Sequence, residues 1–172
     1  MAASTKPKPM ILQGSRGYPV QEICLHVSAT RPDWMATSTF QARFLEIRRW
    51  HVQDNGWKDI GYHWVIDRDG SILPGRKENV IGAGVKNHNN GVIHIVALGG
   101  HGGSANDKIT DSWTDAQIRA VKKKIYEIAQ RTQIRRISGH NEFAAKACPC
   151  FSVPAWVESC GGLASLLAGK GQ

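Results

Sequence analysis

The sequence predicts an α/β fold: a single domain with a central mixed β-sheet flanked by helices. Segments with strand periodicity alternate along the chain with segments that carry an apolar stripe at helical spacing. Residues 91–98 are almost continuously apolar, which is typical of a central strand covered on both faces. A length of 172 residues suits one domain and is sufficient to bury a core without cross-links. Helices packed on one sheet are the economical arrangement of such elements.

The first predicted strand covers residues 22–28. Because side chains alternate along a strand, one face carries the aliphatic residues Ile23, Leu25 and Val27. The other face carries Cys24, His26 and Ser28. His26 lies near the end of this strand, where a rigid backbone can hold a metal ligand. A single histidine in such a place is more often a hydrogen-bonded core residue, so the strand alone does not decide its role.

A helix is predicted from Ser38 to about Asp54. Ser38 and Gln41 have the spacing of a capping box. The apolar stripe of this helix consists of Phe40, Phe44, Ile47 and His51. The dipeptide Asn55-Gly56 follows and is typical of a helix end.

Residues 61–67 and 72–73 predict a hairpin around the Asp69-Gly70 turn. In a regular strand, Tyr62 shares a face with Trp64 and Ile66. Residues 74–90 are rich in Gly and Asn and predict a long loop, which precedes the central strand 91–98. We expect His94, inside that strand, to be a hydrogen-bonded core residue. Residues 99–111 predict another loop that borders a substrate groove.

Thr114 and Gln117 predict a second capped helix, which runs to about Thr132. A short strand at 134–138 then delivers His140 at its end. A further helix is predicted from Val153 to about Leu167, interrupted at Gly161-Gly162. We therefore expect a flexible tail at 1–20, a catalytic domain at 21–160 and a C-terminal tail at 161–172.

The net charge of +8 favours polyanionic partners such as nucleic acid, an anionic cell wall or a membrane surface. No groove-reading motif supports nucleic acid, and no apolar run approaches the ~20 residues of a membrane span. Residues 1–10 lack the apolar segment of a secretory signal, so we expect synthesis in the cytoplasm. The four cysteines form no CxxC pair and predict reduced thiols. We expect a monomer.

The segment from His140 to Pro149 combines a histidine and a cysteine eight positions apart with a lysine, Lys146, two positions before the cysteine, Cys148. Imidazole and thiolate are the side chains that zinc prefers. Taken alone, the segment is equally compatible with an ordinary loop. In the predicted fold, however, His26 at the end of the first strand can approach His140 at the end of the last. Two histidines and a cysteine leave one position open on zinc, as in catalytic sites.

The sequence as a whole resembles the type 2 N-acetylmuramoyl-L-alanine amidases, which include phage endolysins and are related to the peptidoglycan recognition proteins. Four segments carry the resemblance, in the family's order: His26-Val27-Ser28-Ala29-Thr30, Trp57-Lys58-Asp59-Ile60-Gly61-Tyr62-His63, Arg68-Asp69-Gly70, and His140-Asn141-Glu142 with Lys146-Ala147-Cys148-Pro149. Together they span about residues 22–157. The likeness is to the small phage lysozyme-type amidases, whose third metal ligand is a cysteine.

The resemblance implies one zinc ion per chain, bound by His26, His140 and Cys148. It also implies that Tyr62 and Lys146 are catalytic and reach the reacting water or the scissile carbonyl. The bond cut is then the amide between N-acetylmuramic acid and the L-alanine of the stem peptide of peptidoglycan. His63 matches the family pattern, and a structural hydrogen bond explains it as well as a chemical role does.

Three features depart from the family pattern or extend beyond it. Cys150 stands where a small polar residue is expected, and its place near the zinc segment suggests sensitivity to oxidation. The residues before 22 do not take part in the resemblance, and residues 82–111 match only loosely. Regulation of a phage RNA polymerase, known for some relatives, has no counterpart in these residues.

The favoured function is therefore a phage or prophage endolysin that reaches the cell wall after release by a holin. Two alternatives remain open from the sequence. One is a cytosolic amidase that recycles soluble muropeptides, and the other is a non-catalytic peptidoglycan-binding module. The presence of Cys148 favours an enzyme over the module, because such modules often lack the cysteine ligand.

Overall fold

The computed structural model of the protein describes residues 9–169. Its elements follow one another in the order β1 Leu12–Gln13, β2 Tyr18–Pro19, β3 Glu22–Val27, α1 Phe40–Arg49, η1 Trp50–Asp54, β4 Trp64–Ile66, β5 Ile72–Pro74, β6 Val92–Ala97, α2 Ile109–Ser112, α3 Asp115–Ala129, β7 Arg136–Gly139, η2 His140–Glu142, α4 Val153–Ser159 and α5 Gly161–Leu167. Strands and helices alternate along most of the chain, as the sequence predicts. None of the helices in the described residues is long and apolar enough to cross a membrane.

Within residues 9–169, five strands form the main sheet in the order β5-β4-β6-β3-β7. β3 pairs in parallel with both β6 and β7, and β4 pairs in parallel with β6. Only β5 runs antiparallel, as the return strand of the hairpin with β4. The sheet is therefore mixed, and β6 is its central strand, as the apolar segment 91–98 indicates.

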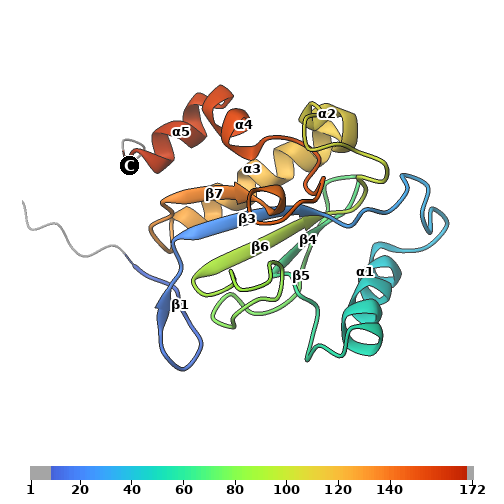
Figure 1. Cartoon of the computed structure of the whole chain (residues 1–172), viewed down its shortest axis with the longest axis horizontal. Helices are drawn as coiled ribbons and strands as arrows, with labels where there is room; N and C mark the ends of the chain where they lie inside the picture. Colours follow the sequence, from blue (N-terminus) through green and yellow to red (C-terminus); the bar gives the residue numbers. More distant parts are fainter. Residues whose placement is uncertain (1–8, 170–172) are drawn as a thin grey trace, which may run out of the picture.

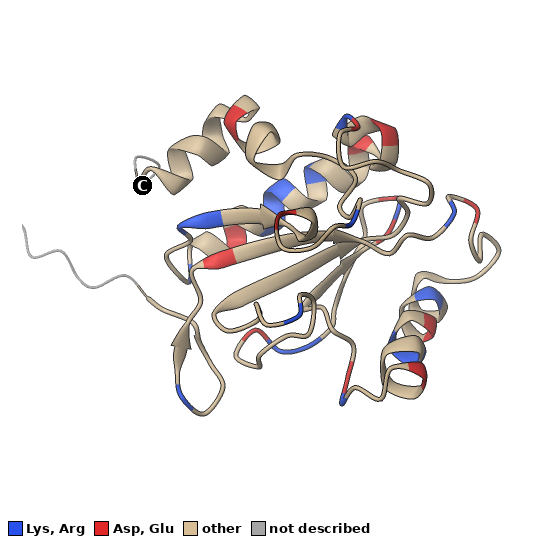
Figure 2. Ribbon diagram, in the orientation of Figure 1, with Lys and Arg blue, Asp and Glu red and all other residues tan. Residues whose placement is uncertain are grey.

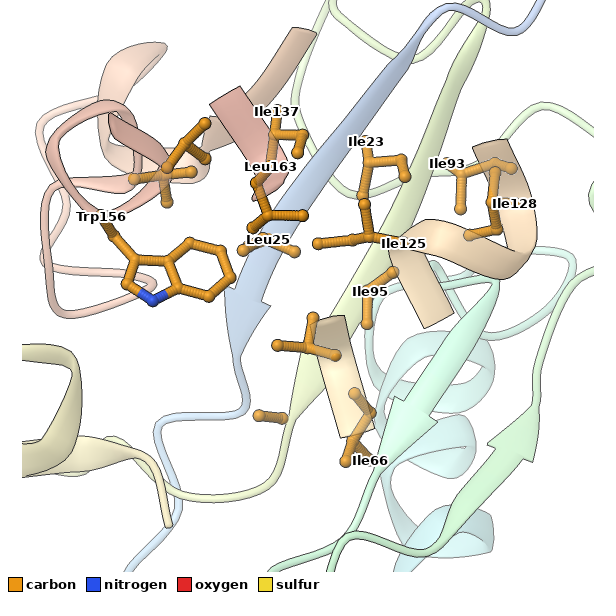
Figure 3. Close-up of a cluster of buried hydrophobic side chains, with 14 of the residues drawn as sticks. Ile23, Leu25, Ile66, Ile93, Ile95, Ile125, Ile128, Ile137, Trp156 and Leu163 are labelled. Carbon is orange, nitrogen blue, oxygen red and sulfur yellow. The ribbon is translucent and has the colours of Figure 1, made fainter. Parts of the chain in front are cut away.

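One face of the sheet packs against α3, α4 and α5 (Figure 1). Ile23 and Leu25 of β3 lie beside Ile125 of α3 and Leu163 of α5 in this apolar cluster (Figure 3). Burying such side chains contributes roughly 1.5–3 kcal/mol each, and this apolar cluster is the largest in the described residues. Alternation along β3 then places Cys24 and His26 on the opposite face.

The opposite face of the sheet is covered by α1, whose Phe44 and Ile47 pack on Val65 and Val96. The predicted cap of this helix is wrong by one residue. The Thr39 hydroxyl, not that of Ser38, accepts the Ala42 N–H, at 3.2 Å. The main chain of Ser38 instead closes a preceding turn, because its N–H donates to the Met35 carbonyl.

Beyond Arg49 the predicted single helix changes its hydrogen bonding and continues as the π-helix η1. Acidic and basic residues are interspersed along α1 and η1, whereas basic residues predominate on α3 and at the start of β7 (Figure 2). Arg49 makes ion pairs with Glu46 and Asp54, and Arg48 pairs with Asp59. The charge of +8 is thus distributed over several elements rather than concentrated on one helix.

The flexible tail predicted at residues 1–20 includes a segment that is folded in the structure. Residues 1–8 of it lie outside the described residues, but β1 and β2 pair as a small antiparallel hairpin within 12–19. The Gln13 side chain is fully buried and donates to the carbonyls of Glu78 and Val92. A buried amide of this kind fixes its segment to the domain, because it is costly to leave unpaired. The folded unit therefore begins before residue 21.

The predicted C-terminal tail is likewise wrong for residues 161–167, which form α5. The helical segment breaks at Cys160, next to the predicted interruption at Gly161-Gly162, and then resumes. Leu163 is 1% exposed and lies in the main core cluster. The structured domain therefore extends past residue 160.

Replacing Leu163 with alanine is expected to lower the free energy of unfolding by about 2–5 kcal/mol, because a buried methyl pair is lost and a cavity remains. Urea denaturation followed by tryptophan fluorescence measures this change. Ser165→Ala, at an exposed position of the same helix, serves as the control and should change stability by less than about 0.5 kcal/mol. Equal stability of the Leu163→Ala and Ser165→Ala proteins would show that α5 is not part of the core.

Candidate metal centre

Two of the predicted ligands meet because their strands are neighbours. His26 is the next-to-last residue of β3, and His140 directly follows β7. The two strands are parallel, with Leu25 paired to Gly139, so both chains leave the sheet at the same edge. The two imidazole rings lie with centroids 5.0 Å apart and nearly perpendicular planes.

Cys148 arrives from the loop that follows η2. Its Sγ lies 3.8 Å from His26 Nδ1 and accepts a hydrogen bond from the Val27 N–H at 3.3 Å. The ligand atoms of His26, His140 and Cys148 all lie within 4.8 Å of one another. The structure therefore brings together the three residues that the sequence predicts as ligands. Two of them, His26 and Cys148, are 122 residues apart in the chain.

The loop that carries Cys148 is fixed by hydrogen bonds on both sides. The Trp113 indole donates to the Pro149 carbonyl at 3.1 Å, and the Asn141 amide donates to the Phe151 carbonyl at 3.0 Å. The Glu142 carboxylate accepts the Gly139 N–H at 2.7 Å, which closes the turn at the end of β7. These contacts fix the loop on both sides of Cys148, and the Val27 N–H holds its sulfur against β3.

The electrostatic setting of these side chains suits a soft divalent cation. Burial lowers the pKa of His26 and of His140, so both imidazoles stay neutral and keep a lone pair for a metal. Burial raises the pKa of the Cys148 thiol to about 12, so a thiolate at this place requires a cation beside it. Two neutral imidazoles and a sulfur are the donors that zinc prefers, and the residues present therefore fit zinc.

The two predicted catalytic residues line a groove that includes His140. This groove has a volume of about 730 Å³, and Tyr62, Lys146 and Trp57 contribute to its walls. The Tyr62 ring lies 5.1 Å from the His26 ring, and burial raises the pKa of its hydroxyl well above the usual value. Lys146 is exposed, and none of the ion pairs in the described part of the chain involves it.

Tyr62 reaches this groove because the predicted strand begins late. β4 starts only at Trp64, since the carbonyls of Gly61 and Tyr62 accept hydrogen bonds from Ala83 and Arg76 of the long loop. The expectation that Tyr62 shares a face with Trp64 and Ile66 is therefore wrong. Its ring packs instead on the α1 side of the sheet, against His51 at 5.2 Å.

His63 and Cys150 are not brought into the group of three. The His63 ring is fully buried, and its Nε2 lies 2.9 Å from the Val80 carbonyl, which makes it a structural residue. Burial lowers its pKa to about 4. Cys150 is 1% exposed, and its thiol donates to the Gly100 carbonyl at 3.4 Å.

Sequence reasoning missed the contact between His26 and His94. The expectation that His94 is a hydrogen-bonded core residue is correct, but its partner is the second nitrogen of a proposed metal ligand, at 3.0 Å. β3 and β6 are adjacent, with Cys24 paired to His94, and this register places both histidines on one face. The contact depends on the register of β3 and β6, and a single sequence carries no signal for that register.

Comparisons with known proteins show the family of the chain. Residues 16–151 match the family model described as N-acetylmuramoyl-L-alanine amidase. The endolysin of Klebsiella phage KP32 is 31% identical over 147 residues, covering 86% of this chain and 91% of that protein. The endolysin of Escherichia phage T7 is 32% identical over 136 residues, covering 79% of this chain and 84% of that protein.

The fold is also found among solved structures. Bumblebee PGRP-SA superposes with a TM-score of 0.66 at 22% identity, covering 91% of this chain and 89% of that one. The family match includes β3, β7 and the loop up to Phe151, and hence all three residues of the candidate metal centre. The chain belongs to the N-acetylmuramoyl-L-alanine amidase family.

Proposed function

We propose that His26, His140 and Cys148 bind one zinc ion, with which this amidase hydrolyses the bond between N-acetylmuramic acid and the L-alanine of the stem peptide. The observation that carries the proposal is the approach of all three ligand atoms to within 4.8 Å at the wall of a groove. His140 belongs both to this group and to the groove, so an ion there is accessible to a substrate. A centre closed by a fourth protein ligand would instead be structural.

When bound, zinc polarises a carbonyl group and lowers the pKa of a water toward neutrality. The side chains of the chain supply the rest of the chemistry. The Lys146 ammonium, free of ion pairs in the described residues, stabilises the negative charge that develops on the carbonyl oxygen. The Tyr62 hydroxyl, from the same groove, orients the attacking water or the carbonyl by donating a hydrogen bond.

The lining of the groove suits an anionic glycopeptide. Lys86 and Lys146 place positive charge along it. Trp57, which is 36% exposed, offers an aromatic face at its wall. Together with the net charge of +8, these features support the anionic cell wall as substrate.

We further propose that the protein acts as a phage or prophage endolysin, made in the cytoplasm as a monomer and released to the wall by a holin. The names of the phage relatives support this role. Assays with intact sacculi and with soluble anhydro-muropeptides distinguish it from muropeptide recycling. An endolysin should act faster on sacculi, and a clear preference for the soluble fragments would favour recycling.

Removing the metal is expected to abolish the release of new L-alanine N-termini from purified cell walls. Chelator-treated protein should be inactive, and stoichiometric zinc should restore its activity. The reason is that, in this proposal, the attacking water is activated only by the bound metal. Full activity after verified removal of the metal would contradict the zinc mechanism. Tight binding to walls without turnover by the zinc-loaded protein would favour a non-catalytic module.

A further inference from the structure

The two ring nitrogens of His26 face different partners. Nδ1 faces the Cys148 sulfur at 3.8 Å, on the side of the candidate metal centre. Nε2 faces the His94 Nδ1 at 3.0 Å, on the side of the sheet interior. Both histidines are fully buried, so His26 Nε2 forms its hydrogen bond with His94 and not with solvent.

This geometry fixes which nitrogen carries the proton if Nδ1 binds a metal. A neutral imidazole has one N–H donor and one acceptor nitrogen. A metal on His26 Nδ1 therefore requires the proton on Nε2, and His94 Nδ1 must accept it. The proton of His94 then lies on its Nε2, which has no hydrogen-bond partner among the described residues.

The His94 ring is held in this orientation by its surroundings. A Cβ atom at Gly84 would lie 2.4 Å from His94 Nδ1, and a Cβ at Gly82 would lie 2.6 Å from His94 Cδ2. The His63 ring stacks on the His94 ring, with centroids 5.9 Å apart, and His63 Nδ1 accepts the His94 main-chain N–H at 2.9 Å. Two glycines and a stacked imidazole thus leave the ring little freedom to rotate.

We propose that His94 is a positioning residue for the metal centre. Its Nδ1 accepts the Nε2 proton of His26 and so holds His26 in the tautomer that presents Nδ1 to zinc. Partners of this kind orient a metal ligand and raise its basicity. The proposal rests on the zinc ligand set of the proposed function, and it adds a residue that does not itself touch metal or substrate.

A competing arrangement is a metal ion held by Cys24, His26 and His94, whose ligand atoms also lie within 4.8 Å of one another. All three of these residues are fully buried, whereas His140 and Cys148 are partly exposed. A substrate therefore has no access to an ion at that second place.

The test compares two replacements of similar size. In His94→Asn the amide oxygen takes the place of Nδ1 and still accepts from His26, whereas His94→Leu has nearly the same shape and no acceptor. Competition with a chromophoric chelator measures the zinc dissociation constant of each protein. We expect His94→Leu to bind zinc about 10- to 100-fold more weakly, the range for losing such a partner. We expect His94→Asn to stay within about threefold of the parent protein.

Two outcomes would overturn the role of His94: equal weakening by both replacements, or unchanged zinc affinity in His94→Leu. Thermal unfolding of both variants checks that they remain folded, and equal melting temperatures remove a stability explanation for any difference. Because the removed group is an acceptor, a merely structural role would not separate Asn from Leu.

Control variants separate this proposal from the ligand set itself. Cys24→Ser should leave the zinc affinity unchanged, and its loss of zinc would place the ion at the competing cluster and overturn the proposal. His140→Ala should lose zinc whatever the role of His94. If His140→Ala instead keeps its zinc, the ligand set of the proposed function fails, and the comparison of Asn with Leu at position 94 then shows whether His94 still supports His26.

Discussion

Replacing Cys148 with serine, or His140 with alanine, is expected to abolish both zinc retention and amidase activity. The three ligand atoms converge within 4.8 Å, and two remaining ligands do not complete a tight site. Loss of the sulfur also removes the acceptor of the Val27 N–H, which holds the loop against β3. Metal analysis of protein purified without chelators, set beside release of L-alanine N-termini from cell walls, measures both effects.

Matched replacements elsewhere serve as controls for these two variants. Cys160→Ser makes the same change at the junction of α4 and α5, and His101→Ala makes it in an exposed loop. Neither residue belongs to the group of three, so both variants should keep zinc and activity. Full zinc occupancy in Cys148→Ser or in His140→Ala would show that the proposed ligand set is wrong.

Replacing Lys146 with alanine is expected to leave zinc in place but to lower kcat by about 10²-fold or more, the scale of losing one oxyanion donor. Lys146 lines the groove beside His140 and Tyr62, and its ammonium is directed to no acidic partner in the described residues. Its charge is therefore available to the substrate. Steady-state hydrolysis of a soluble muropeptide, measured with zinc-loaded protein, gives kcat and KM separately.

Lys123→Ala is the control for Lys146→Ala, because it removes the same charge from the exposed side of α3. It should alter binding to intact walls slightly and kcat not at all. A loss that falls on KM alone in Lys146→Ala would indicate that this lysine binds substrate without stabilising the transition state. An unchanged rate would remove Lys146 from the mechanism.

Periodicity in the sequence predicts the elements whose pattern follows from burial. The fully buried β6 and the alternating β3 are apolar where they face the core, and Thr114 with Gln117 forms the predicted capping box of α3. These features are local, because a strand face or a helix cap depends on residues a few positions apart. The mixed sheet flanked by helices follows from their order.

The errors lie where distant contacts decide the backbone. The buried Gln13 amide donates to the carbonyls of Glu78 and Val92. These partners are more than 60 residues away, so the pattern of residues 1–20 alone does not predict the contact. α5 begins with two consecutive glycines, and the burial of Leu163 in the main core outweighs their low helix propensity. Tyr62 does not follow the alternation of a strand, because the carbonyls of Gly61 and Tyr62 accept hydrogen bonds from the long loop.

The candidate site is predicted in part for the same reason. His26 and His140 follow from the ends of two parallel strands that meet at one edge of the sheet, Cys148 follows from its place in the segment after His140, and the family resemblance assigns the catalytic roles to Tyr62 and Lys146. The sheet register is what joins His26 to His94, and a single sequence does not contain it.

The proposed ligands come from the beginning and the end of the fold, on the neighbouring strands β3 and β7. A nascent chain leaving the ribosome therefore carries His26 long before it carries Cys148, 122 residues later. Strand pairing across such a distance is slow, because the intervening chain must be ordered first. A product that stops before Cys148 therefore lacks one of the three proposed ligands, so the proposed metal centre can be completed only late in synthesis.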